Sequence, residues 1–185
     1  LAHIASYAIG AYVTALLSTE FQRSIYLCLP ASMVVAAFFA LLIGGIAARL
    51  RHDYFALGTL AFSSIVSAVL INWKSVTRGV LGIPGIPRPE IGEIDFYQNY
   101  NFLKLVALLT FVSLAVLLFL FRSRFARNLR AQAENPYATM ALGKSIRSIR
   151  NDAFIISSMF AGLAGGIFAY YINYIDPSSF ALHEM

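Results

Sequence analysis

The chain has 185 residues, of which 59% are hydrophobic and only 12% are charged, and its mean hydropathy is +0.71. A soluble domain carries about 25% charged residues, so this composition excludes an ordinary soluble domain and indicates a polytopic membrane protein. The net charge of +5 does not indicate nucleic-acid binding, because the basic residues flank long apolar runs, as membrane topology signals do.

Five apolar segments predict an all-α, polytopic bundle of transmembrane helices, which we treat as one permease-like membrane domain over residues 1–185. A helix needs roughly 20 residues to cross the hydrocarbon core of a bilayer, and only the first segment is short. Because the chain begins at Leu1, inside an apolar run, we expect a fragment of a longer protein. The segments are 4–18, 27–48, 55–73, 103–121 and 153–175.

The loops between these segments predict the orientation of the chain. The loops 49–53 and 122–152 together carry nine Lys or Arg and three acids, a balance of 9 − 3 = +6. The remaining loops and ends carry five bases and six acids, which gives 5 − 6 = −1. Because basic loops are retained in the cytoplasm, we place 122–152 inside the cell and 74–101 outside.

Small residues recur at four-residue spacing in the second segment and again in the last one. Such spacing lets the backbone of a neighbouring helix approach closely, so these positions are predicted to pack helices together. A surface along which helices slide during function is the alternative. The residues are Ala36, Ala40 and Gly44 in the second segment, and Gly162 and Gly166 in the last.

The external stretch 74–101 is rich in Gly and Pro, which predicts irregular backbone rather than a regular helix. At membrane depth, irregular backbone is tolerated only where protein covers it or where it lines a cavity. Two interpretations stay open: an external linker, or a docking surface or mouth lining for a substrate delivered from outside. The candidate residues of this external loop are Gly79, Gly82, Gly85 and Pro87.

The basic stretch 122–152 contains a short predicted helix at about 136–142. Asn135 suits an N-cap, Pro136 suits the first helical turn and Gly143 suits the C-terminal end. This helix would expose small side chains that a groove on a partner protein could hold. Residues 138–145 approach the phosphate-binding pattern G-x-x-x-x-G-K-[ST], but Ala138 replaces its first glycine and no buried strand precedes it. Nucleotide binding by this chain is therefore not expected.

Neither catalysis nor metal binding finds support in the sequence. His3, His52 and His183 lie far apart, without carboxylates at metal-ligand spacing, so we expect no enzyme activity and no metal site. The apolar segments contain no ionisable Asp, Glu, Lys or Arg except Lys104 at the start of the fourth. Proton-driven transporters typically use intramembrane acids or histidines. If the chain transports a solute, we expect the energy to come from a partner that acts on 122–152.

Four stretches of the chain resemble one known family. They cover most of the chain, in the same order as in the permease subunits of bacterial ABC importers for branched-chain amino acids, and particularly the M-type subunit of the permease pair. The resemblance implies a transmembrane permease subunit that moves branched-chain amino acids across the bacterial inner membrane. It holds no cofactor itself, because partner subunits bind the ATP. The four stretches are 3–17, 48–66, 72–89 and 122–171.

The same resemblance leaves alternatives open and implies partners. Related permeases handle urea or short amides, and a self-sufficient channel or secondary transporter is the alternative from another class. The expected partners are a second permease subunit, cytoplasmic ATPase subunits, a periplasmic substrate-binding protein and the lipid membrane, but no nucleic acid.

The resemblance also places the site that couples the chain to the ATPase. In the family, a segment similar to 134–146 rests in a groove on the ATP-hydrolysing subunit. Glu134, Ala138 and Gly143 match its acidic, small and glycine positions. Thr139 stands where a second alanine is common, and residues 135–137 depart from the pattern. The expected coupling residues are Glu134, Asn135, Pro136, Tyr137, Ala138, Thr139, Ala141, Gly143 and Lys144.

Overall fold

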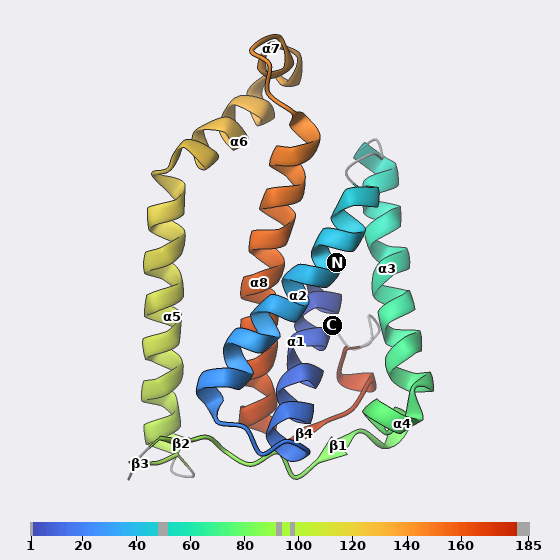
Figure 1. Cartoon of the computed structure of the whole chain (residues 1–185), viewed down its shortest axis with the longest axis vertical. Coiled ribbons are helices and arrows are strands. Elements are labelled where there is room, and N and C mark those ends of the chain that lie inside the picture. The colour runs from blue at the N-terminus through green and yellow to red at the C-terminus, as the bar shows by residue number, and fades with distance from the viewer. Residues whose placement is uncertain (1, 48–51, 92–93, 97–98, 181–185) are drawn as a thin grey trace.

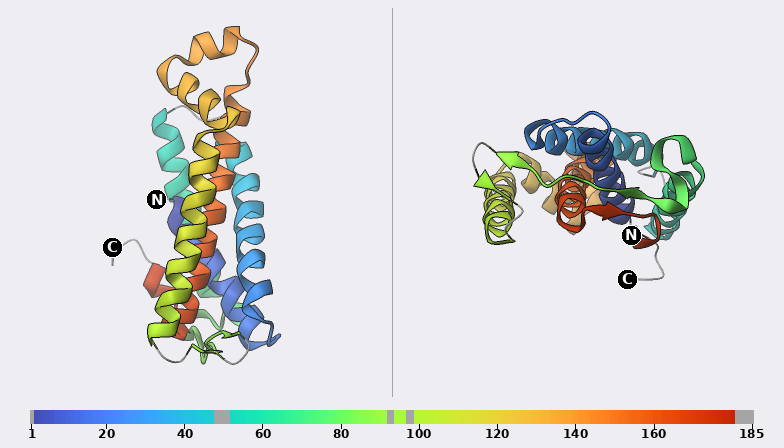
Figure 2. Two further views of the ribbon diagram at one scale, coloured as in Figure 1. Left: turned by 90° about the vertical axis from the view of Figure 1, so that its left-hand side faces the viewer. Right: turned by 90° about the horizontal axis from the view of Figure 1, so that it is seen from below.

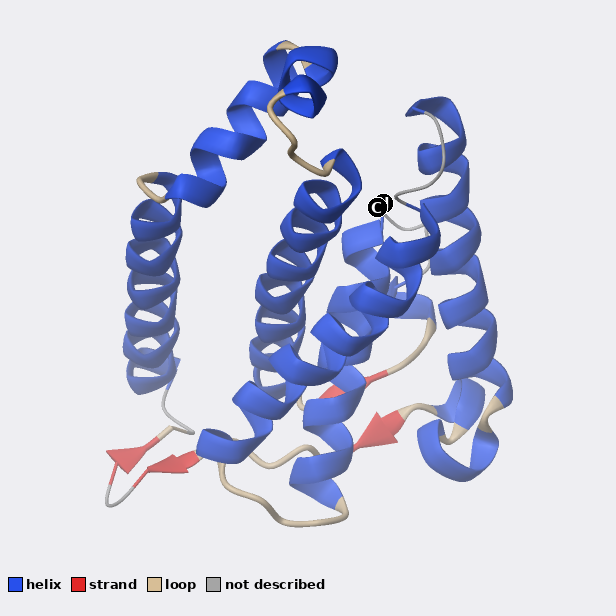
Figure 3. Cartoon of the chain, turned by 45° about the horizontal axis from the view of Figure 1, so that its top comes forward, coloured by secondary structure: helices blue, strands red, loops and turns tan. Residues whose placement is uncertain are grey.

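The computed structural model describes residues 2–47, 52–91, 94–96 and 99–180, and within them the predicted all-α fold is confirmed (Figure 1). The strands are two residues long and lie at one end of the helices, as Figure 3 shows. The long helices are α1 (Ala2–Thr19), α2 (Ile25–Ala47), α3 (His52–Asn72), α5 (Asn99–Phe121) and α8 (Ile146–Ile172). The shorter elements are α4 (Lys74–Thr77), α6 (Arg124–Glu134), α7 (Pro136–Ala141), the 3-10 turns η1 (Gly79–Leu81) and η2 (Ser178–Phe180), β1 (Ile83–Pro84), β2 (Glu90–Ile91), β3 (Ile94–Asp95) and β4 (Tyr174–Ile175).

The expectation of five membrane spans is wrong for the described residues. Three helices are long and apolar enough to cross a bilayer, namely α2, α5 and α8, and α3 with the bent turn after it makes a fourth if the pair counts as one span. The helix that does not count is α1. It is less apolar than the spanning stretches of α2, α5 and α8, with His3, several hydroxyl groups and two tyrosines along it.

The core of the fold is formed by α1 together with α2 and α8, both of which pack along it (Figure 1, Figure 2). Ala8, Ala11 and Ala15 of α1 are at most 2% exposed. Such small side chains let the neighbouring backbones come close, which replaces the hydrophobic driving force that is missing inside a bilayer. The first apolar segment is therefore the centre of the described bundle.

The small residues that were predicted to pack helices lie at close contacts between helices. Ala36 and Ala40 on α2 are 0% and 1% exposed. A Cβ atom added at Gly162 would lie 2.6 Å from the Cβ of Ala36, and one added at Gly166 would lie 2.6 Å from the Oγ1 of Thr14. These contacts allow α8 to sit tightly between α1 and α2.

Helix α5 stands apart from this core, at one edge of the bundle (Figure 2). None of its spanning residues is buried in the chain except Phe102 near its start. An apolar cavity of about 340 Å³ separates it from α2 and α8, and Met33, Leu105 and Leu109 are among its lining residues. In a bilayer this surface contacts either lipid or another membrane helix.

The two predicted loops lie at opposite ends of the bundle. The helices α6 and α7 lie at the end of the bundle where α2 ends and α3 begins, whereas α4 and the strands lie at the opposite end (Figure 1). The predicted cytoplasmic loop 122–152 and external loop 74–101 are therefore on opposite faces. Both contain more regular structure than expected: 122–152 is mostly helical, and 74–101 opens with the one-turn helix α4 before its first glycine.

Candidate functional site

The first candidate site is the segment that joins α5 to α8, residues 122–145, which we call the coupling hairpin. The chain leaves α5 through a turn in which the Ser123 hydroxyl donates to the Leu120 carbonyl over 2.6 Å. Helix α6 then crosses toward α8, and α7 forms the tip (Figure 1). Ser145 is the N-cap of α8, and its hydroxyl oxygen accepts a hydrogen bond from the Ser148 amide at 3.4 Å.

The local structure of α7 is the one that the sequence predicts, although the helix ends at Ala141 rather than at 142. The Asn135 side-chain oxygen accepts from the Ala138 amide at 3.0 Å, which satisfies one of the free N–H groups at a helix start. Pro136 occupies the first helical position, where its missing N–H costs nothing. Gly143 has φ +73° and ends the helical stretch in the left-handed conformation.

The exposure of the tip only partly matches the expected face of small residues. Ala138 and Ala141 are exposed as predicted, as are Glu134 and Lys144 at the two ends of the segment. Thr139 is 3% exposed, so its assignment to the exposed coupling face is wrong. Its hydroxyl donates to the Asn135 carbonyl at 3.0 Å, which ties the helix to its own cap.

Large apolar side chains dominate the solvent face of the tip instead. Tyr137 is 84% exposed, Met140 is 58% exposed and Leu142 is 79% exposed. Sequence reasoning named Tyr137 but missed Met140 and Leu142. Their signal was available, because they are apolar residues inside the one long polar stretch of the chain. Exposure of apolar side chains to water is unfavourable, so a cluster of them on a surface marks a contact site.

The opposite side of the hairpin rests on α8. Ala126 and Gln132 of α6 and Ile149 of α8 are 5–7% exposed, and α6 packs on both α7 and α8. Helix α8 then runs without a break for 27 residues, about 40 Å, to the other face of the bundle. Helix α8 therefore connects the hairpin to the opposite face of the bundle without a break.

The first turns of α8 also contact α2. The Oδ1 atom of Asn151 fills the space that a side chain at Gly44 would need. Phe154 packs on Ala40 in a small separate cluster of buried residues. Gly44 is thus a close-contact residue, as predicted, and it lies at the end of α2 nearest to the coupling hairpin.

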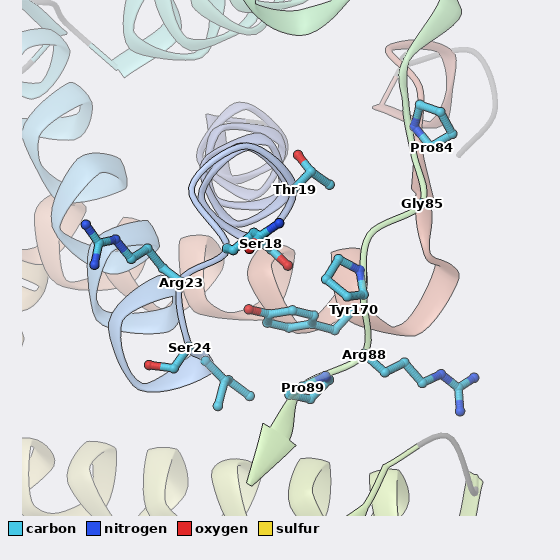
Figure 4. A pocket seen from close by; sticks show the side chains of 12 residues that line it. Ser18, Thr19, Arg23, Ser24, Pro84, Gly85, Arg88, Pro89 and Tyr170 are labelled. Carbon is cyan, nitrogen blue, oxygen red and sulfur yellow. The ribbon is translucent and has the colours of Figure 1, made fainter.

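The second candidate site is an open cleft of about 610 Å³ at the opposite end of the bundle (Figure 4). Residues of the α1–α2 turn, such as Ser18 and Ser24, form one wall, and the Gly/Pro loop forms the other. Tyr170 of α8 lies between the two walls (Figure 4). Two arginines, Arg23 and Arg88, are among the lining residues, and Arg88 points out of the cleft and donates to the Phe96 carbonyl at 3.2 Å (Figure 4).

Residues 79–87 of the Gly/Pro loop form an ordered strap rather than a loose linker. β1 pairs antiparallel with β4, which follows α8, and Ile83 lies opposite Ile175. The Asn173 side-chain amide donates to the Ile86 carbonyl at 2.7 Å. Ile83 and Ile86 are 3% and 1% exposed, so the strap is anchored in the core.

The four predicted residues of this loop separate into two groups. Gly85 and Pro87 line the cleft, whereas Gly79 and Gly82 do not. Gly79 and Gly82 have φ values of +59° and +66° and lie against the carbonyl groups of Ile71 and Ile175. They shape the strap, because a side chain at either position would meet backbone atoms.

The described part of the chain contains no cluster of metal ligands. In residues 2–47, 52–91, 94–96 and 99–180, no three His, Cys, Asp or Glu side chains gather closely enough to hold a metal ion.

Comparison with known proteins gives one consistent family. The model of the family described as branched-chain amino acid transport system / permease component matches residues 1–184. The chain is 37% identical to the High-affinity branched-chain amino acid transport system permease protein LivM of Escherichia coli (strain K12), and the match covers 96% of this chain and 47% of LivM. The LivM protein of Salmonella typhimurium has the same identity and coverage.

A more distant relative has a different name. The chain is 29% identical to the Guanosine ABC transporter permease protein NupQ of Bacillus subtilis, over 87% of this chain and 55% of NupQ. No solved structure matches the chain significantly. The chain spans about half the length of the LivM relatives that it matches. Because one family model matches nearly its whole length, the chain belongs to the family of branched-chain amino acid transport system permeases.

Proposed function

We propose that this chain is a membrane-spanning permease subunit of an ATP-driven ABC importer, and that it helps to move branched-chain amino acids across a bacterial inner membrane. The observation that carries the proposal is the coupling hairpin. An apolar tip, formed by Tyr137, Met140 and Leu142, stands on the basic face of a membrane bundle and rests on one continuous helix. Exposed apolar residues at such a place suit a groove on a partner protein.

ATP hydrolysis in this proposal belongs to the partner. Residues 138–145 form the end of α7 and the turn that leads to α8, and no buried strand precedes them, which is the wrong context for cradling phosphates. The permease acts as a conduit and not as an enzyme. Hydrolysis on the partner displaces α7, and α8 carries the displacement to the outer face.

In this proposal, the displacement of α8 also reaches the outer cleft. Tyr170 lies in the last part of α8, and β4 directly after α8 is hydrogen-bonded to the strap. A shift of α8 along its axis therefore moves both the floor and one wall of the cleft. We assign the cleft to the outer mouth, where a periplasmic binding protein delivers the solute.

The character of the interior suits a small solute without net charge. Among the described residues, the buried polar side chains are hydroxyl groups and one amide, and no Asp, Glu, Lys or Arg is buried. An interior without fixed charges is compatible with a small zwitterionic amino acid, and equally with urea. The apolar surface of α5 and the cavity beside it provide the place for the second permease subunit.

Reconstitution tests this function directly. The complete transporter, with the binding protein outside proteoliposomes and ATP inside, should take up leucine, isoleucine or valine only when the ATPase subunits are present. Urea and guanosine serve as competing solutes. Uptake of one of these competitors in place of leucine would refute the proposed substrate. Sustained leucine flux without the ATPase would refute the ATP-driven mechanism.

A further inference from the structure

A row of exposed arginines lies on one face of α6, where the coupling hairpin leaves the membrane-spanning α5. Arg124, Arg127 and Arg130 follow one another at three-residue spacing, which places them in one sector of the helix. All three are exposed, and so is Arg122 in the turn before α6. These charges add to the basic balance of the loop, but that balance alone does not require the three arginines of α6 to share one face.

The opposite face of α6 is already occupied by the protein. Ala126 and Gln132 are 5% and 6% exposed, and Phe125 and Leu129 are half-buried, where α6 packs on α7 and α8. The helix therefore has a fixed orientation. Its apolar side faces the hairpin and its arginine side faces away from the bundle.

The arginines have no partner of opposite charge in the part of the chain that the structure describes. None of Arg122, Arg124, Arg127 and Arg130 forms an ion pair with a described acidic side chain. The only acid in the hairpin is Glu134, at the far end of α6. Three exposed arginines on one short helix and a fourth in the turn before it, without an acidic partner among the described residues, favour an anionic partner.

The depth of the arginine face identifies that partner. Helix α5 has 23 residues and is about 35 Å long, so it uses nearly its whole length to cross a core of roughly 30 Å. The headgroup region adds only about 5–8 Å on each side. Because α6 begins three residues after α5 ends and turns sharply across the end of the bundle, its first turns lie at the level of the lipid phosphates (Figure 1).

We propose that the arginine face of α6 binds the headgroups of anionic phospholipids in the cytoplasmic leaflet. Guanidinium groups suit this partner, because their planar donors match the oxygens of a phosphate group. Bound headgroups would hold α6 at its tilt and thereby present α7 at a fixed height above the membrane. This inference depends on the sidedness of the chain and not on its solute or its ATPase.

The test measures lipid binding at α6 by fluorescence quenching. A fluorophore is attached to the thiol introduced by an Ala131→Cys substitution, since position 131 is exposed on α6 and the native Cys28 is buried. The full chain is reconstituted in phosphatidylcholine vesicles. Phosphatidylglycerol or phosphatidylcholine with a nitroxide near the headgroup is then added as the quencher. We expect half-quenching at a lower mole fraction of phosphatidylglycerol than of labelled phosphatidylcholine.

Charge removal provides the decisive comparison. In the Arg124→Gln/Arg127→Gln variant, the mole fraction of phosphatidylglycerol at half-quenching should rise by about fivefold or more, since each charge near an anionic leaflet changes its affinity by about that factor. The control Lys74→Gln/Arg78→Gln removes two exposed charges at the opposite end and should leave the value unchanged. The Arg124→Lys/Arg127→Lys variant should keep most of the preference.

Two results would overturn the proposal. Equal quenching by the two lipids before any charge is removed would show that α6 has no anionic lipid beside it. An unchanged preference for phosphatidylglycerol in the Arg124→Gln/Arg127→Gln variant would assign the preference to other residues. If, in addition, that variant retained less ATPase during purification, the arginines would belong to an acidic protein surface. The leucine uptake experiment is independent of all these outcomes.

Discussion

The contact between α8 and α2 at Gly162 makes the strongest quantitative prediction. Replacing Gly162 by Ala places a methyl group 2.6 Å from the Cβ of Ala36 and 2.9 Å from the Ser32 carbonyl oxygen. Ordinary van der Waals contact begins at 3.4 Å, so α2 must move by 3.4 − 2.6 = 0.8 Å. On the other side of α8, the Gly162 carbonyl lies where a side chain at Gly10 would be, so α8 cannot retreat toward α1.

The loss of stability that we expect for Gly162→Ala follows from the close contacts on both sides of α8. Overpacking of a filled interior typically costs about 1–3 kcal/mol, because backbones shift or rotamers are strained. A Gly→Ala change in an unobstructed helix has the opposite sign and stabilises it by up to about 1 kcal/mol. Gly45 supplies the matched control, since it is exposed on α2 and nothing lies within 4 Å of an added Cβ atom.

The assay is reversible unfolding of the detergent-solubilised chain by sodium dodecyl sulfate, followed by circular dichroism. We expect Gly162→Ala to lower the free energy of unfolding by about 1–3 kcal/mol, and Gly45→Ala to leave it unchanged or raise it. Equal stability of the two variants would show that α2 yields freely, and the argument for close helix packing would fail.

Three further predictions concern the two faces of the bundle. Asn135→Ala removes the cap of α7 and should cost that helix about 1 kcal/mol, which hydrogen exchange detects as faster exchange of the α7 amides; unchanged exchange would contradict the capping role. Tyr137→Ala/Leu142→Ala removes two of the exposed apolar side chains at the tip and should weaken the binding of the ATPase by about a hundredfold or more, since buried contacts of this size are worth about 1.5–3 kcal/mol each; an unchanged affinity for the ATPase would argue against the proposed groove. Gly82→Ala should destabilise the chain by more than Gly85→Ala, because both have positive φ but only the first meets a backbone carbonyl; equal melting temperatures would refute the anchored strap.

Several features could be read from the residues because their causes are local. The cap of α7 depends on Asn135, on the proline after it and on Gly143, which all lie within ten residues of the chain. The close-packing positions on α2 and α8 follow from residue size at helical spacing. Sidedness follows from counting charges in the loops, since the membrane treats each loop independently of the final packing.

Other features arise from contacts between distant parts of the chain. The strap is ordered because β1 pairs with β4, whose register joins Ile83 to Ile175. No pattern within 74–101 contains that information. For the same reason, the sequence did not separate the glycines that line the outer cleft from those that lie against a carbonyl group.

By itself, then, the sequence determined that the chain is a helical membrane protein of a known permease family, which face of it is basic, and where the short helix at the tip begins. Only the tertiary structure decided that α1 is the buried centre, that Thr139 faces inward while Met140 and Leu142 face solvent, and that α8 links the two candidate sites. The physical reason is that capping, helix length and loop charge act between near neighbours, whereas the burial of a side chain depends on which distant helix packs against it.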